Sequence, residues 1–172
     1  MPAHATPNPP APSAPSATDS QTARFYDILK RYWGYDSFRS IQLDIIRSMP
    51  TGGGKSITFQ VPAMAMEGMT IVVTPLVALM KDQVEHLCRR GMRAAAIYAD
   101  QSHDDNMRHL DNAVFGAYKF LYVSPERLGT EVFQNKVRRM NVAFITVDEA
   151  HCISQWGYDF RPAYLQIALL RD

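Results

Sequence analysis

The sequence predicts a three-layer α/β fold, in which a parallel sheet is covered by helices on both faces. Four short apolar or β-branched runs, at residues 70–74, 94–98, 119–124 and 141–147, alternate with longer amphipathic stretches. Short, continuously apolar strands are typical of parallel sheets buried on both faces. A glycine-rich loop at residues 51–56 ends in Gly-Lys-Ser and precedes an apolar helix expected at residues 57–66. This arrangement is typical of phosphate-binding α/β domains.

Chain length, net charge and cysteine content limit the classes of protein to which the chain can belong. The chain has 172 residues, enough for one domain with a sizeable core. Its formal charge is +1, so any nucleic-acid site must be a local basic patch. Two cysteines without metal-like spacing indicate free thiols and a reducing, intracellular setting. We expect the nucleus if the source is a eukaryote and the cytoplasm if it is a bacterium. No apolar run is long enough to cross a bilayer, so we expect no membrane partner.

The N-terminal part divides into a tail and a helical segment. Residues 1–23 are rich in Pro, Ala and Ser and have almost no large apolar side chain, which predicts a disordered tail. The folded domain is therefore expected at residues 24–172. Apolar residues at helical spacing predict a helix at residues 24–33, ended by Gly34. A turn follows, and a second helix is expected at residues 38–48, capped by Ser37.

The segment before the glycine-rich loop lacks an expected element. A phosphate-binding loop normally connects a buried strand to a helix. Here the predicted helix at residues 38–48 leads directly into Met49 and Pro50, with no room for a strand of about five residues. Either residues 43–46 leave the helix and form a short strand, or that strand is missing.

Beyond the loop, helices are predicted between the strands. They are expected at residues 76–90, 102–114 and 125–139, with a last helix from Pro162 to the end of the chain. Gly91 follows the first of these and marks its end. The alternation of strands and helices requires crossover connections, and this supports the parallel sheet.

The glycine-rich loop carries a pattern suited to a nucleotide. Glycines allow backbone N–H groups to approach an anion, a lysine places a charge on β- and γ-phosphates, and a serine hydroxyl can bind Mg²⁺. The dipole of the following helix favours the same anion. The residues concerned are Thr51, Gly52, Gly53, Gly54, Lys55 and Ser56.

Two acidic residues follow the strand predicted at residues 141–147. Asp148 lies at the carboxyl end of this strand, where ligands bind in open α/β sheets. Its carboxylate can hold Mg²⁺ together with Ser56, and Glu149 is placed to orient or deprotonate a water molecule. The alternative is a solvated Asp-Glu pair in a loop. The upstream Gly-Lys-Ser favours the functional interpretation.

Several motifs together resemble the first RecA-like domain of RecQ-family DNA helicases, which belong to superfamily 2. The resemblance runs from about Phe25 to the last residue, and its most specific part is an aromatic-rich loop at residues 151–162. The other motifs stand at residues 35–42, 51–56, 74–83, 123–128 and 148–151, the last being a DEAH box. The resemblance implies a P-loop NTPase that uses ATP and Mg²⁺.

The resemblance also implies a nucleotide site. Tyr35 and Arg39 can sandwich a purine ring, and the amide of Gln42 suits an adenine edge. In the alternative interpretation, Tyr35 and Phe38 are core aromatics and Gln42 is a solvated helix residue. The implied catalytic residues are Lys55, Asp148, Glu149 and His151, and the implied Mg²⁺ ligands are Ser56 and Asp148.

A DNA-binding surface is implied as well, for single-stranded or forked DNA. Aromatic side chains in a loop suit stacking on bases, and hydroxyl and cationic groups suit contacts to a DNA backbone. The expected residues are Trp156, Phe160 and Arg161 in the loop, and Thr74, Lys81, Ser124 and Arg127 elsewhere. The alternatives are an anchoring role for the loop, ordinary helix surface for Lys81 and Arg127, and a structural ion pair for Arg127.

Two hypotheses follow for the function. In the first, the chain belongs to an ATP-dependent helicase that unwinds DNA in the 3′–5′ direction during repair or recombination. In the second, it is a non-catalytic remnant that binds nucleotide or DNA weakly. The second RecA-like domain and its arginine fingers lie outside the sequence, and such positive charges contribute about 10³-fold or more to phosphoryl transfer. We therefore expect a truncated product that does not unwind DNA alone.

Overall fold

The computed structural model describes residues 17–38, 56–149 and 162–170. Within these residues, four parallel strands form one sheet in the order β2-β3-β1-β4. The strands are β1 (Met69–Val73), β2 (Ala94–Ile97), β3 (Phe120–Val123) and β4 (Val142–Val147). Each predicted strand is confirmed, with bounds that differ by one residue at most.

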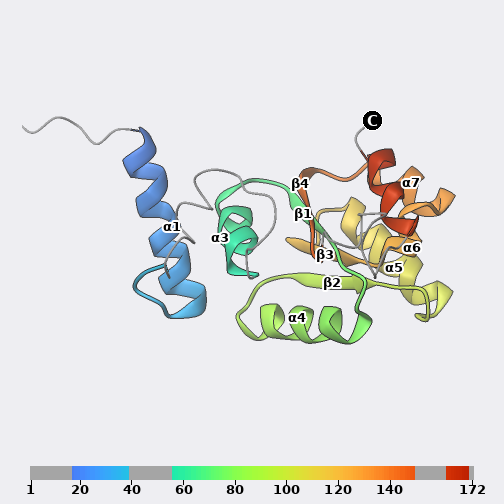
Figure 1. Cartoon of the computed structure of the whole chain (residues 1–172), viewed down its shortest axis with the longest axis horizontal. Coiled ribbons are helices and arrows are strands. Elements are labelled where there is room, and N and C mark those ends of the chain that lie inside the picture. The colour runs from blue at the N-terminus through green and yellow to red at the C-terminus, as the bar shows by residue number, and fades with distance from the viewer. Residues whose placement is uncertain (1–16, 39–55, 150–161, 171–172) are drawn as a thin grey trace, which may run out of the picture.

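Helices cover both faces of this sheet (Figure 1). They are α1 (Ala17–Trp33), α3 (Ile57–Ala65), α4 (Val77–Arg89), α5 (His103–Val114), α6 (Pro125–Leu128), α7 (Glu131–Val137) and the 3₁₀ helix η2 (Pro162–Leu170). The predicted three-layer α/β fold is therefore confirmed for the described part of the chain. No helix in that part is long and apolar enough to span a membrane.

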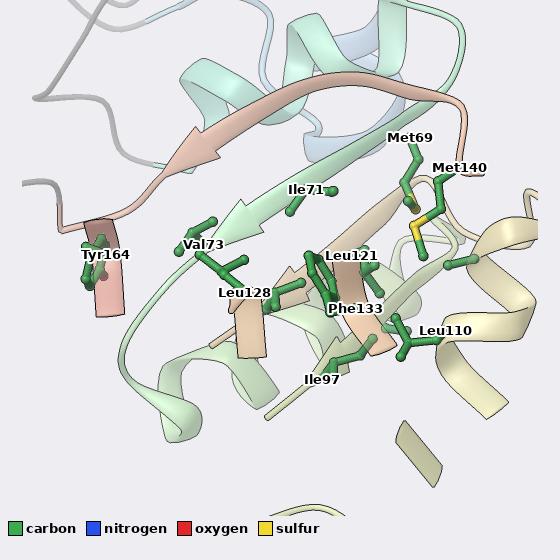
Figure 2. Close-up of a cluster of buried hydrophobic side chains, with 13 residues drawn as sticks. Met69, Ile71, Val73, Ile97, Leu110, Leu121, Leu128, Phe133, Met140 and Tyr164 are labelled. Atoms are coloured by element: carbon green, nitrogen blue, oxygen red, sulfur yellow. The ribbon is translucent and has the colours of Figure 1, made fainter. Parts of the chain in front are cut away.

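The larger core lies between the sheet and helices α5, α6, α7 and η2 (Figure 2). The odd-numbered strand residues Ile71, Val73 and Leu121 point to this face, as the two-residue period of a strand requires. They pack against Leu110 of α5 and Phe133 of α7. This core is stabilised mainly by the burial of apolar surface, which contributes roughly 25 cal/mol of free energy per Å² removed from water.

The opposite face of the sheet packs against α3 and α4. Val72 and Tyr122 point to this face and contact Ala63 of α3 and Met80 of α4. Helix α1 packs on the outer side of α3, where its Leu29 is buried in a third apolar cluster. Among the described residues, β4 pairs with β1 alone, and all six of its residues are half-buried.

Three predicted helices differ from those observed. They are the helix predicted at residues 24–33, the one at residues 125–139 and the last one after Pro162. Helix α1 begins at Ala17, so residues 17–23 are helical and do not belong to a disordered tail. Once the apolar segment of a helix is formed, extension by polar residues is less costly than nucleation. Residues 1–16 lie outside the described part, as do residues 39–48 of the predicted second helix.

The single helix predicted at residues 125–139 is wrong, because two short helices occupy this segment. Helix α6 ends before Gly129, and Thr130 starts α7. The Thr130 hydroxyl accepts a hydrogen bond from the Phe133 amide at 3.4 Å, a typical N-cap contact. The segment after Pro162 is helical as predicted, although of the 3₁₀ type.

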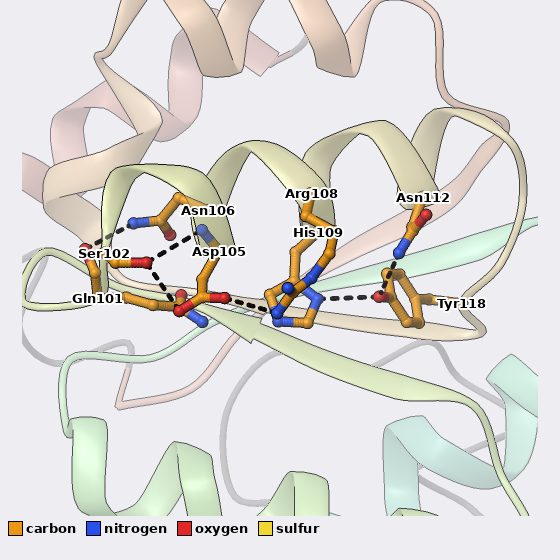
Figure 3. Close-up of polar contacts among 8 residues, drawn as sticks. All are labelled: Gln101, Ser102, Asp105, Asn106, Arg108, His109, Asn112 and Tyr118. Carbon is orange, nitrogen blue, oxygen red and sulfur yellow. Dashed lines mark hydrogen bonds and ion pairs between the residues drawn. The ribbon is translucent and has the colours of Figure 1, made fainter.

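Helix α5 has a polar cap that the sequence pattern did not reveal (Figure 3). The Ser102 hydroxyl accepts a hydrogen bond from the Asp105 amide at 3.1 Å and donates one to the Asp105 carboxylate at 2.7 Å. The second contact lowers the pKa of Asp105, because it stabilises the ionised form. Arg108 pairs with the same carboxylate one turn later.

The connection between α3 and β1 requires a glycine. Gly68 has φ +85°, and a Cβ atom built there would lie 2.8 Å from the Asn141 carbonyl oxygen. Lys119 fixes the same connection, because its Nζ atom donates to the carbonyl oxygens of Met66 at 2.5 Å and Gly68 at 2.7 Å. Burial lowers the pKa of Lys119. This connection therefore holds α3, the sheet and the start of β4 together.

We predict that Gly68→Ala destabilises the chain by about 2–3 kcal/mol, because backbone strain and the clash with Asn141 add to each other. Gly116→Ala is the matched control. Gly116 also has a positive φ, of +74°, but beyond its chain neighbours nothing lies within 4 Å of the position that a Cβ atom would take. The control should lose only about 1 kcal/mol. Equal losses in urea unfolding would contradict the steric explanation.

Candidate functional site

The carboxyl ends of three strands place predicted site residues along one edge of the sheet. Thr74 follows β1, Ser124 follows β3 and Asp148 follows β4. Their amides continue the strand ladders: Thr74 N–H donates to Val123 O at 3.2 Å, and Asp148 N–H donates to Val73 O at 2.8 Å. Asp148 follows the carboxyl end of β4, where the sequence placed it, and Thr74 and Ser124 lie along the same edge. This is the edge at which open α/β sheets bind ligands.

Asp148 is held in place by its own turn. Its Oδ1 atom accepts a hydrogen bond from the Glu149 amide at 3.0 Å. Glu149 has φ +54°, which is uncommon for a residue with a side chain and turns the backbone sharply out of β4. Strain of this kind gathers at functional sites. The geometry therefore agrees with a role for this carboxylate pair beyond that of a solvated loop.

Tyr164 of η2 supports the same turn. Its hydroxyl donates to the Asp148 carbonyl oxygen at 3.1 Å, and the side chain is almost fully buried. The sequence pattern gives no sign of this role for Tyr164. Its apolar surroundings suggest only a core residue, and no sequence pattern indicates which carbonyl its hydroxyl reaches.

The start of α3 carries no side-chain cap from Ser56, and a helix N-terminus of this kind suits an anion. Ser56 is the N-cap residue, yet its side chain makes no capping hydrogen bond, and the first turn has no acidic residue. Ser56 and Tyr35 line one hollow of about 250 Å³ between the end of α1, the start of α3 and helix α4. The structure thus brings together two of the predicted nucleotide residues.

The two aromatic residues of the predicted adenine-recognition motif, Tyr35 and Phe38, have different roles. Tyr35 is 48 % exposed, so it is not a core residue and remains accessible for stacking. Phe38 packs edge-to-face on Tyr26, with ring centroids 5.2 Å apart, and joins the apolar cluster of α1 and α3. The core interpretation is therefore correct for Phe38 and wrong for Tyr35.

A buried polar chain lies at the base of the hollow. The Gln60 amide donates to the Tyr122 hydroxyl at 3.2 Å, and that hydroxyl donates to the Gln83 side-chain oxygen at 2.8 Å. Burial raises the pKa of Tyr122 well above its usual range, the Gln60 contact opposes this rise, and the charge of Asp148 adds to it. The phenol therefore stays protonated and keeps its donor. No sequence pattern indicates these hydrogen bonds between Gln60, Tyr122 and Gln83.

The residues predicted to contact DNA are not equally accessible. Lys81 is exposed on α4, and its Nζ atom lies 4.8 Å from the centre of the Tyr98 ring. Thr74 and Ser124 are buried, and their hydroxyl groups have no hydrogen-bond partner within the described ranges. A DNA backbone would reach these two hydroxyls only after neighbouring side chains moved.

Arg127 has a structural role, and among residues 17–38, 56–149 and 162–170 that role rests on hydrogen bonds and not on an ion pair. Its guanidinium donates to the carbonyl oxygens of Tyr98 at 3.3 Å and Ala99 at 3.2 Å. These contacts fix α6 to the segment that follows β2. Part of the donor capacity of Arg127 is thereby used before any ligand binds.

The remaining predicted site residues lie outside the described ranges and stay predictions. They are Arg39, Gln42, Thr51, Gly52, Gly53, Gly54, Lys55, His151, Trp156, Phe160 and Arg161. Residues 43–46, considered as a replacement for the missing strand, lie outside as well.

Comparison with known proteins agrees with this geometry. The profile of the DEAD/DEAH box helicases matches residues 36–171. The chain belongs to this family. It is 46 % identical to the ATP-dependent DNA helicase RecQ of Bacillus subtilis, over 86 % of this chain and 27 % of the relative. It is 41 % identical to the RecQ helicase of Pasteurella multocida, over 85 % of this chain and 25 % of the relative.

A eukaryotic relative shows the same pattern. Identity to the ATP-dependent DNA helicase Q5 of Mus musculus is 37 %, over 87 % of this chain and 17 % of that protein. The resemblance to RecQ helicases is therefore confirmed. The chain spans about a quarter of the length of the bacterial relatives and less of the eukaryotic one.

We predict that Tyr164→Phe lowers the free energy of unfolding by about 1 kcal/mol, because it removes a buried donor from the Asp148 carbonyl. Tyr35→Phe, which alters an exposed hydroxyl, should change it by less than about 0.5 kcal/mol. Urea unfolding of the two variants measures the difference. Equal stability of Tyr164→Phe and the unmodified chain would show that this contact does not hold the turn.

Proposed function

We propose that residues 24–172 form part of the first RecA-like domain of a RecQ-like, ATP-dependent DNA helicase. One observation supports this most directly. Ser56, whose side chain does not cap the start of α3, shares a hollow with the exposed Tyr35, as expected for a residue near phosphates and one that stacks on a base. Gln60, one turn after Ser56, contacts Tyr122 near the carboxyl end of β3. The start of α3 therefore lies toward the sheet edge that carries Asp148.

ATP with Mg²⁺ would supply the phosphoanhydride bond whose hydrolysis drives unwinding. In this proposal, Lys55 neutralises phosphate charge, and Ser56 and Asp148 hold Mg²⁺ directly or through water. Glu149 would orient or deprotonate the attacking water molecule, and His151 of the same motif would be the further catalytic residue. Among residues 17–38, 56–149 and 162–170, no group of three or more His, Cys, Asp or Glu could hold a metal. Phosphate and water would therefore complete the coordination of Mg²⁺.

Single-stranded or forked DNA would lie across the carboxyl edge of the sheet. The exposed Lys81 supports a contact to the DNA backbone, and Arg127, Thr74 and Ser124 border the same edge. Trp156, Phe160 and Arg161 would stack on bases or bind phosphate. Such a substrate implies an intracellular protein, located with chromosomal DNA. Unwinding in the 3′–5′ direction belongs to the proposal for the whole protein.

The first test is binding of a fluorescent ATP analogue with Mg²⁺ to the purified chain. Lys55→Ala should weaken binding by about tenfold or more, because a charged contact to phosphate contributes about 1.5–3 kcal/mol. Lys136→Ala is the matched control. Lys136 pairs with Asp111 of α5, away from the start of α3, and its loss should leave the affinity unchanged.

A folded chain that binds no analogue would refute the nucleotide site and leave the non-catalytic remnant as the correct hypothesis. Circular dichroism in the same experiment shows whether the chain is folded. Removal of Mg²⁺ with a chelator should reduce the affinity of the unmodified chain, because Ser56 and Asp148 then lose their shared ion.

A second prediction concerns DNA. Lys81→Ala should weaken binding of a single-stranded oligothymidylate about threefold to tenfold and reduce the dependence of log affinity on log salt concentration by about one unit. Lys30→Ala serves as the control, since Lys30 is exposed on α1 and pairs with Asp36. If both variants keep the affinity and the salt slope of the unmodified chain, Lys81 does not contact the DNA backbone.

A further inference from the structure

Tyr122 lies where three elements with predicted site residues meet. It belongs to β3, two residues before Ser124. Through Gln60 it contacts α3, which begins next to Ser56, and through Gln83 it contacts α4, which carries Lys81. No other hydroxyl described above joins the nucleotide side of the proposed site to its DNA side.

The Tyr122 hydroxyl acts both as a hydrogen-bond acceptor and as a donor. Its oxygen accepts the hydrogen bond from Gln60, and its single proton is donated to Gln83. Tyr122 has no exposed surface, and Gln60 is only 4 % exposed, so water does not readily replace Gln60. Gln83 is half-buried and lines the hollow. Breaking one of these contacts would leave a buried polar group unpaired, which costs about fivefold to a hundredfold in the corresponding equilibrium constant.

The apolar contacts around Tyr122 are of a different kind. Ala63 of α3 and Met80 and Leu87 of α4 pack in the same cluster as its ring. Such contacts tolerate small displacements of a helix, because dispersion forces are not directional. Hydrogen bonds of 2.8 and 3.2 Å do not, since they weaken steeply with angle and distance. The contacts of the Tyr122 hydroxyl therefore depend more strongly on the positions of α3 and α4 than the apolar contacts of its ring do.

We propose that Tyr122 is a positioning residue that transmits nucleotide binding at the start of α3 to the DNA-contacting helix α4, by holding Gln60 and Gln83 on one hydroxyl group. This inference rests on the proposed function of the two helices. A nucleotide that shifts the first turn of α3 either moves Gln83 with it or breaks the chain. Because breaking the chain is costly, the movement of Gln83 is favoured. That movement changes the affinity of α4 for DNA, and by reciprocity DNA changes the affinity for nucleotide.

The test compares affinities for a fluorescent Mg²⁺–ATP analogue with and without a saturating oligothymidylate. We expect the oligonucleotide to change the nucleotide affinity of the unmodified chain by about fivefold or more. In Tyr122→Phe each separate affinity should stay within about twofold, whereas the coupling factor should fall below about twofold. Full coupling in Tyr122→Phe overturns the proposal, as does a fall in both affinities with the coupling retained.

Tyr118→Phe is the matched control. This variant also removes a hydroxyl with two partners, His109 and Asn112, but both belong to α5 on the opposite face of the sheet (Figure 3). The coupling factor should be unchanged. An equal loss of coupling in Tyr118→Phe would mean that any weakened tyrosine contact disturbs the chain, and it would overturn the specific role of Tyr122.

A second measurement needs no ligand and separates the two proposals. Gln60→Leu and Gln83→Leu should shift the urea midpoint non-additively in the unmodified chain, because both act through one hydroxyl. In the Tyr122→Phe background the same shifts should become additive. Additive shifts in the unmodified chain overturn the connection through Tyr122. Failure of the unmodified, folded chain to bind nucleotide overturns the proposed function instead.

Discussion

The pairing of β1 with both of its neighbours is the constraint on which the rest of the structure depends. All five residues of β1 are buried, and the strand is paired in parallel on each side. Because parallel strands end at the same edge, this pairing decides that the residues after β1, β3 and β4 become neighbours. Thr74, Ser124 and Asp148 share that edge because main-chain hydrogen bonds, including those of their own amides, align the strands.

A second group of polar contacts fixes the helices to the sheet at defined points. Lys119 and Gly68 hold the end of α3, whereas Tyr122 holds its start. Arg127 and Tyr164 do the same for α6 and for the turn after β4. Apolar burial supplies most of the stabilisation of such a domain. The polar contacts add direction, because each requires one donor and one acceptor at hydrogen-bond distance.

Local patterns in the sequence were sufficient to predict the strands, the carboxyl edge and the family. The strand residues are short apolar runs, and Gly34 and Gly91 both have positive φ at the ends of their helices. Contacts between distant segments could not be predicted in this way. Nothing in the sequence indicates that Tyr122 lies between Gln60 and Gln83, or that Thr74 and Ser124 are buried beneath their neighbours.

Errors in the helices have a similar origin. Gly129 and Thr130 are compatible with a loop as well as with the interior of a weak helix, and the position of Phe133 in the core decides between them. The early start of α1 reflects extension of a helix that α3 stabilises by packing on Leu29. In both cases tertiary contacts override the propensity of a short segment.

The order of the strands has a consequence for how the chain folds. Thr70 of β1 pairs with Phe120 and Phe144, about fifty and seventy residues later. During synthesis, β1 would therefore leave the ribosome long before either partner, with two open edges and an apolar sequence. Such a strand pairs readily with foreign strands. Non-local pairing of this kind also slows folding relative to helical proteins of similar size. Productive folding must wait until β4 has been synthesised.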